Sequence, residues 1–74
     1  MKEIHIDAKC LQCPGPIVQL FNAIKSAEPG DVVVVEATDK GFYSDVQAWC
    51  KKTKNELLSL EDKGDVIVAK VKKV

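Results

Sequence analysis

Four consecutive valines, Val32–Val35, constrain the fold of this chain more than any other feature. A continuous run of β-branched residues is typical of a strand that is covered on at least one face. The chain has 74 residues, so we expect one domain, residues 1–74. A domain of this size buries only about 60% of the surface that its unfolded chain exposes. Any chemistry should therefore lie at the surface, on a loop or at the end of an element.

Hydrophobic periodicity divides the chain into six elements. Ile4 and Ile6 alternate with polar residues and predict a strand. Ile17, Leu20, Phe21 and Ile24 lie at i, i+3, i+4 and i+7 and predict one apolar helical face. The expected elements are a strand around residues 3–7, a helix that ends near Ala27, a strand at Val32–Val35, a helix that starts at Ser44, and strands at Leu57–Leu60 and Val66–Val71. Two helices with one apolar face each should lie side by side on one face of the sheet.

The connections predict the topology. The two β-α-β crossovers should be right-handed and make the strands that they join parallel. A hairpin loop at Glu61–Asp65 makes one pair antiparallel. The prediction is an α+β fold, a two-layer α/β sandwich of order β-α-β-α-β-β with a mixed four-stranded sheet.

The ends of the second helix have their own signals. Ser44 followed by Gln47 is a capping-box pattern, which predicts that the helix starts at Ser44. Asp45 would then lie in the first turn, where the helix dipole favours an acid. Asn55 is the predicted C-cap.

Composition excludes several classes of function. The formal net charge is zero and the chain has no arginine, which argues against a nucleic-acid-binding role. No apolar run approaches the 18 residues or so of a membrane span, and Met1 to Asp7 lacks the apolar core of a signal peptide. We therefore expect a cytoplasmic protein. Three cysteines in such a chain indicate reactive or buried thiols rather than a disulfide scaffold.

Cys13 is the strongest candidate for a reactive residue. It precedes the predicted start of the first helix, where free backbone N–H groups and the helix dipole favour a thiolate over a thiol. Pro14 suits the first helical position and Pro16 the first turn, where neither removes an intrahelical bond. Both prolines restrict the backbone and stiffen the presentation of the sulfur. Free cysteine is often a small buried hydrophobe, but this loop–helix junction favours a nucleophile.

Cys10 completes a C-x-x-C pair with Cys13, which suits a redox dithiol or half of a metal site. A structural zinc needs four ligands. The remaining candidates are Cys50, expected in the core, and His5, expected on a solvated strand face. We therefore expect no metal and no cofactor. Two interpretations of Cys10 stay open: an auxiliary or resolving thiol, and a loop residue without a role.

The other polar residues have structural interpretations. Asp7 should accept loop N–H groups in an Asx turn and so support the cysteine loop. A role as general base for Cys13 is disfavoured, because a carboxylate beside a thiol opposes ionisation of the thiol. Phe42 and Trp49 should be in the core. Two groups of lysines are expected to form a solvated face rather than a dock for an acidic partner: Lys51, Lys52 and Lys54, and Lys70, Lys72 and Lys73.

The run from Asp7 to Pro16 resembles the TusA/SirA-like sulfurtransferase family. The family pattern is Asp-x-x-Gly-Leu-x-Cys-Pro-x-Pro, and this chain has Asp7-Ala8-Lys9-Cys10-Leu11-Gln12-Cys13-Pro14-Gly15-Pro16. Further landmarks match in order along nearly the whole chain: Pro29-Gly30, Thr38-Asp39, Asp45-Val46, Trp49-Cys50 and Leu57-Leu58. One position departs from the pattern, because Cys10 replaces the family glycine. A cysteine there is strained if the position needs a positive φ.

The resemblance implies a sandwich like the C-terminal domain of translation initiation factor three, and a persulfide on Cys13. It implies a relay from a sulfur donor, such as a cysteine desulfurase or a rhodanese-like domain, to an acceptor protein. Family uses include tRNA thiolation, molybdenum-cofactor maturation and sulfur oxidation. Relatives with three cysteines resemble domains fused to rhodanese or flavin-dependent disulfide-reductase modules. This adds fusion or association with a flavin disulfide/persulfide reductase to the implied partners.

Three functions compete at this point. Sulfur relay through Cys13 is the function that we favour, and it makes the chain a sulfurtransferase. A dithiol redox module would instead use Cys10 and Cys13 together. A non-catalytic RNA-binding or adaptor domain rests on fold analogy and the lysines, and the zero net charge counts against it.

Overall fold

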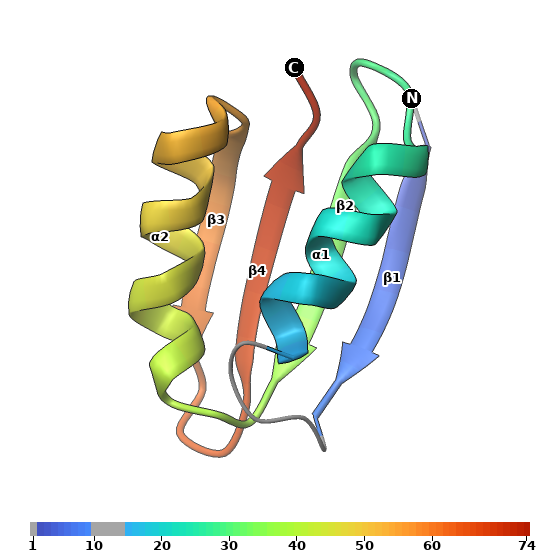
Figure 1. Ribbon diagram of the computed structural model, residues 1–74. Helices are drawn as coiled ribbons and strands as arrows, with labels where there is room; N and C mark the ends of the chain where they lie inside the picture. The colour runs from blue at the N-terminus through green and yellow to red at the C-terminus, as the bar shows by residue number, and fades with distance from the viewer. Residues whose placement is uncertain (1, 10–14) are drawn as a thin grey trace.

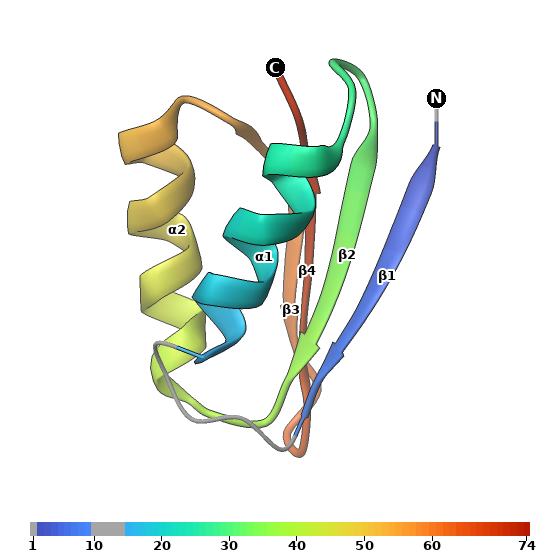
Figure 2. The same ribbon diagram turned by 45° about the vertical axis from the view of Figure 1, so that its right-hand side comes forward.

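The computed structural model of the chain describes residues 2–9 and 15–74. Its elements are β1 Glu3–Ala8, α1 Gly15–Ser26, β2 Val32–Ala37, α2 Gly41–Thr53, β3 Glu56–Asp62 and β4 Ile67–Lys72. Figure 1 shows α1 and α2 side by side over one face of the sheet, and Figure 2 separates the helix layer from the sheet layer. The predicted α+β sandwich with a mixed four-stranded sheet is confirmed.

The strand order of the sheet is β1-β2-β4-β3. β1 pairs with β2 in parallel, with Ala8 opposite Ala37, as the first crossover predicts. β4 lies between β2 and β3 and is antiparallel to both. The sequence predicted one antiparallel pair, and the structure has two. A hairpin signal shows that β3 and β4 pair, but it does not show which of them lies beside β2.

The core fills the space between the helices and one face of the sheet. Leu20 and Ile24 of α1 and Phe42 and Val46 of α2 point into it, and all four are buried. Phe21, predicted on the same face of α1 as Leu20 and Ile24, is instead 50% exposed, because that side of the helix faces away from the core. The sheet contributes alternate residues of its strands: Val33, Val35 and Ala37 of β2, and Ile67, Ala69 and Val71 of β4. Alternation along the strands therefore leaves the other face of the sheet uncovered by helices (Figure 2).

The start of α2 differs from the prediction. The helix begins at Gly41, so Ser44 lies within it and is not the N-cap, and Asp45 lies beyond the first turn. The side chain of Gln47 bonds a backbone carbonyl four residues earlier, at 2.9 Å, rather than closing a capping box. A carboxylate before the helix takes over: Asp39 Oδ1 accepts the Gly41 N–H at 2.9 Å.

The end of α2 and the final hairpin also shift. Lys54, with a left-handed φ of 63°, is the C-cap of α2, so the prediction of Asn55 is wrong. Asn55 Oδ1 instead accepts the N–H of Val74 at 3.2 Å. β3 extends to Asp62, which shortens the predicted loop. Within the described residues, neither helix is long and apolar enough to cross a membrane.

Candidate functional site

The candidate site lies at one end of the molecule. β1 and β2 finish there, α1 and α2 begin there, and the β3–β4 turn lies beside them, at the lower end in Figure 1. We call this the site end. Parallel pairing of β1 and β2 brings their carboxyl ends together, so the segment after Ala8 and the segment after Ala37 leave the sheet side by side.

Two hydrogen bonds fix the chain where it leaves β1. Asp7 Oδ1 accepts the N–H of Lys9 at 3.1 Å, which confirms the predicted Asx turn. The Thr38 hydroxyl donates to the carbonyl oxygen of Lys9 and so joins the segment after β1 to the segment after β2. Ala8, between the two bonded positions, is fully buried. The chain therefore enters residues 10–14 from an anchored position.

Thr38 is one of the site-end residues whose contacts the sequence analysis missed. It entered only as a landmark of the family pattern, and a threonine in a loop has many uses. Its contact with Lys9 depends on pairing between β1 and β2, 29 residues apart. A signal did exist: Thr38 immediately follows the second strand just as Lys9 follows the first.

α1 begins at Gly15 and receives the chain on the far side of residues 10–14. Pro16 lies in its first turn, as predicted, and its ring is fully buried. A proline in the first turn removes no intrahelical bond. The first turn has no acidic residue, and the positive end of a helix dipole favours an anion.

A lysine clamp holds the neighbouring part of the site end. Lys40 Nζ donates to Asp62 Oδ1 at 3.1 Å and to the carbonyl oxygen of Gly64 at 2.6 Å. The Gly64 N–H and then the Lys40 ammonium lower the pKa of the Asp62 carboxyl below its usual 3.8. The start of α2 is thereby joined to the β3–β4 turn.

The predicted site residues divide into two groups. Asp7 and Pro16 lie at the two edges of the site end, where the sequence placed them. Cys10, Cys13 and Pro14 lie outside the described residues. Their predicted roles therefore stay predictions, and so does the placement of Pro14 at the first helical position.

Cys50 is a core residue, as predicted. It lies on the inner face of α2, is 4% exposed, and burial raises the pKa of its thiol to about 11. A thiol with that pKa is protonated at neutral pH and is a poor nucleophile. Cys50 therefore supplies packing rather than chemistry.

His5 is exposed on β1, where its Nε2 lies 2.7 Å from Glu3 Oε1. Its side chain is on the uncovered face of the sheet, since it alternates with Ile4 and Ile6, which pack against the core. The sheet thus separates His5 from Cys50. Within residues 2–9 and 15–74, no three His, Cys, Asp or Glu side chains are grouped to hold a metal ion.

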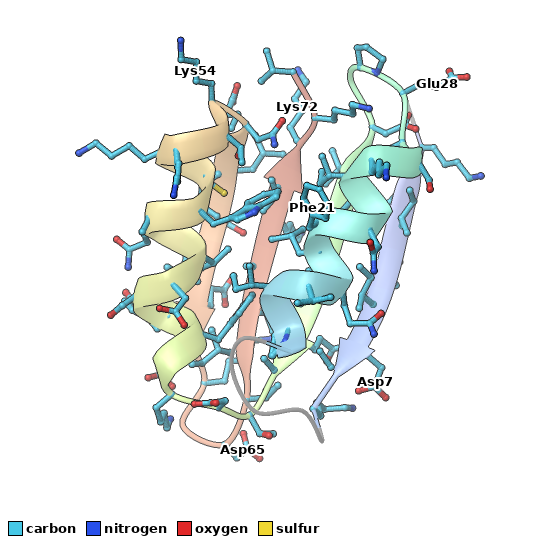
Figure 3. The ribbon with its side chains drawn as sticks, in the orientation of Figure 1. Asp7, Phe21, Glu28, Lys54, Asp65 and Lys72 are labelled. Atoms are coloured by element: carbon cyan, nitrogen blue, oxygen red, sulfur yellow. The ribbon has the colours of Figure 1, made fainter. Side chains whose placement is uncertain are left out.

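The two lysine groups lie away from the site end. Figure 3 shows Lys54 and Lys72 at one end of the molecule and Asp7 at the other. Lys51, Lys52 and Lys54 are exposed at the end of α2. Lys73 has a structural role, because its Nζ donates to the carbonyl oxygen of Ala27 at 2.6 Å. Neither group flanks the start of α1.

Sequence comparison identifies the family. Residues 4–73 match the family described as sulfurtransferase TusA. The chain belongs to the TusA family. TusA of Allochromatium vinosum, a sulfur carrier protein, is 37% identical over 60 residues, 81% of this chain and 79% of that protein.

Two relatives from Bacillus subtilis are more similar to this TusA-family chain, and both are provisionally named sulfur carrier proteins. YrkI is 44% identical over 62 residues, which cover 84% of this chain and 83% of YrkI. YrkF is 42% identical over 64 residues, 86% of this chain but only 35% of YrkF. The chain thus spans about a third of YrkF. The comparisons support a sulfur-relay role, as the sequence predicted.

Proposed function

We propose that Cys13 carries sulfur as a persulfide, which it accepts from a donor protein and passes to an acceptor protein. The observation that carries the proposal is the position of Cys13, two residues before α1, in a TusA-family chain. The first turn of that helix carries no acid, and the positive end of its dipole favours a bound anion. Cytoplasmic location is part of the same proposal.

The proposed chemistry is thiol exchange in two steps. The Cys13 thiolate attacks the outer sulfur of a donor persulfide, a new S–S bond forms at Cys13, and the donor leaves as a thiolate. An acceptor thiolate then attacks the outer sulfur of the Cys13 persulfide and releases the Cys13 thiolate. One sulfur atom moves and no net oxidation occurs. Both steps need Cys13 to meet a second protein, which suits a surface position on a small domain.

The roles of the neighbouring residues follow from this scheme. Asp7 and Thr38 anchor the start of the cysteine loop through Lys9, and Pro16, whose ring is fully buried, restrains the first turn of α1. Cys10 is an auxiliary thiol or has no role. Donors of the cysteine desulfurase or rhodanese-like class fit the scheme, as does a flavin-dependent reductase that acts on the persulfide.

The test is the intact mass of the chain after incubation with a persulfide donor, followed by peptide mapping. We expect one added sulfur on Cys13 that reductant removes. The Cys13→Ser variant should lose this product, and the matched Cys50→Ser variant should keep it, because Cys50 is buried. Loss of two hydrogens between Cys10 and Cys13, without added sulfur, would show the dithiol redox module instead.

A further inference from the structure

The exposed side of α1 differs in chemistry from the rest of the surface. No charged residue occurs between Lys9 and Lys25, although 30% of the chain is charged. Four residues of α1 in this stretch are exposed, and we call them the α1 outer face: Val18, Gln19, Phe21 and Asn22. Val18 is 49% exposed and Phe21 50%. Interface centres are typically depleted of charge and enriched in aromatic residues.

The core does not account for this exposure. Leu20 and Ile24 supply the buried side of α1, and Ile17 packs against the core beside them. Phe21 extends from α1 on the side of the helix layer, towards α2 (Figure 3). Val18 lies one turn before it, nearer to the site end. Large half-exposed apolar side chains at this spacing, beside the proposed sulfur carrier, mark an interaction site.

The charged residues at the site end indicate the charge of a partner's surface. The site end carries mostly acidic side chains, which are Asp7, Glu36, Asp39, Asp45, Glu61, Asp62 and Asp65, against the three lysines Lys9, Lys40 and Lys63. The opposite end has more bases than acids, with Lys2, Lys25, Lys51, Lys52, Lys54, Lys72 and Lys73 against Glu3, Glu28, Asp31 and Glu56. Figure 3 shows Asp7 and Asp65 at one end, and Lys54 and Lys72 together with the acidic Glu28 at the other. The net charge of zero therefore conceals a polarised molecule.

We infer that the α1 outer face docks the sulfur-donor protein, through an apolar contact surface flanked by basic residues. The inference rests on the proposed function, because it places the donor against the helix that follows Cys13. Apolar contact at Val18 and Phe21 provides the affinity. Attraction between the acidic site end and basic donor residues steers the encounter.

The experiment measures the rate of Cys13 persulfide formation against the concentration of the full chain, with a cysteine desulfurase and L-cysteine as the donor probe. Phe21→Lys should raise KM roughly tenfold, because it removes an apolar contact and repels a basic partner. Tyr43→Lys is the matched control: Tyr43 is an aromatic residue on α2 that is 39% exposed. It should change KM by less than about twofold. Phe21→Leu should restore most of the native KM.

A second donor separates this inference from the proposed function. Inorganic polysulfide needs no docking, so it should load Cys13 equally in the native chain and in Phe21→Lys. Equal loading together with an unchanged desulfurase KM would overturn the docking inference alone. Failure of polysulfide to load native Cys13 would overturn both proposals.

Salt tests the charge of the partner. Transfer from the desulfurase should slow as ionic strength rises, because screening weakens attraction between opposite charges. A rate that rises with salt would overturn the basic donor surface. Two other outcomes would overturn donor docking at the α1 outer face. One is a Phe21→Lys defect that affects only transfer from loaded Cys13 to an acceptor, and the other is a defect explained by a concentration-dependent dimer of the chain.

Discussion

The two helices bury similar faces and expose different ones. α1 places Leu20 and Ile24 in the core, and α2 places Phe42 and Val46 there. On the outside, α1 is uncharged up to Lys25, whereas α2 exposes acidic and basic residues such as Asp45 and Lys51. The inner faces follow from the need to cover one sheet. The outer face of α1 has no such structural explanation, and α1 is the helix that follows the proposed sulfur carrier.

The largest expected effect tests the likeness of the inner faces. Leu20→Ala in α1 should destabilise the fold by about 2–5 kcal/mol, and Phe42→Ala in α2 by about 3–5 kcal/mol, because both side chains are fully buried. Urea unfolding measures both free energies. Tyr43→Ala, an exposed neighbour of Phe42, should cost less than about 1 kcal/mol. A cost at Leu20 no larger than at Tyr43 would show that the two inner faces are not equivalent.

The second effect compares the cysteines associated with the two helices. Burial raises the pKa of Cys50 from 9.0 to about 11, so its thiolate should be about 100-fold rarer at neutral pH than that of an ordinary cysteine. In a Cys10→Ser/Cys13→Ser chain, iodoacetamide should therefore modify Cys50 about 100-fold faster in urea than in the folded state. In a Cys10→Ser/Cys50→Ser chain, Cys13 should react rapidly when folded. Equal rates for Cys50 in both states would contradict its assignment to the core.

The third effect compares two threonine hydroxyls at opposite ends of the molecule. Thr38 donates to the carbonyl of Lys9 at the site end, and Thr53 donates to the carbonyl of Trp49 at 2.8 Å at the end of α2. Loss of one such bond corresponds to about 1 kcal/mol. If this bond positions Cys13, Thr38→Val should slow the loading of Cys13 by polysulfide about fivefold, which is the rate factor that corresponds to about 1 kcal/mol.

The control variants isolate positioning from stability. Thr53→Val should lose a similar free energy of unfolding and leave the loading rate unchanged. Thr38→Ser, which keeps a hydroxyl, should restore the rate. If Thr38→Val and Thr53→Val load Cys13 equally fast, Thr38 does not position the cysteine loop.

The fourth effect concerns how α2 begins. Asp39→Ala should cost about 1 kcal/mol, because its carboxylate accepts the N–H of Gly41 at 2.9 Å. Ser44→Ala should change the free energy of unfolding by less than about 0.5 kcal/mol, since Ser44 lies on the exposed side within the helix. Thermal or urea unfolding measures both. A larger loss at Ser44 would restore the capping box that the sequence predicted.

The smallest effect lies at the end of α1. Asp31 accepts the N–H groups of Glu28 and Lys2, each at 3.0 Å, and these bonds lower the pKa of its carboxyl below 3.8. The folded state therefore binds this proton more weakly than the unfolded state. The stability that Asp31 contributes is present above pH 3.8 and is lost as pH falls through the lowered pKa.

Acid titration of the unfolding free energy measures this contribution. Asp31→Asn should flatten the decline below pH 3.8. Asp65→Asn, in the exposed β3–β4 turn, is the matched carboxylate control. If both variants follow the native curve, the turn after α1 does not depend on the ionised carboxylate.

Local patterns predicted most of the fold. Alternation at Ile4 and Ile6 and the helical spacing of Leu20 and Ile24 gave elements that the structure contains, because each depends on burying one face. The order of β4 and β3 did not follow, since a hairpin pairs two strands without saying which one joins the rest of the sheet. The start of α2 was predicted too late in the chain. Ser44 and Gln47 have the spacing of a capping box, but the same residues are equally compatible with positions inside a helix.

The site was predictable in part for the same reason. Asp7 acts on Lys9, two residues away, and its turn was predicted from local chemistry alone. Thr38 acts on the same residue across 29 positions, and only the register of β1 and β2 brings them together. The α1 outer face also needed the structure. The apolar spacing placed Phe21 on the buried side of α1, and its 50% exposure shows that this placement was wrong.

The position of β4 has a consequence for how the domain is made. β3 joins the sheet only through β4, the last strand in chain order. During synthesis, β1, α1 and β2 can assemble as soon as they leave the ribosome, but β3 has no neighbour until β4 emerges. A nascent chain halted before Ile67 would therefore expose the apolar edge of β2 together with an unpaired β3, both open to aggregation. Completion of the sheet therefore depends on β4, the strand that joins β3 to β2.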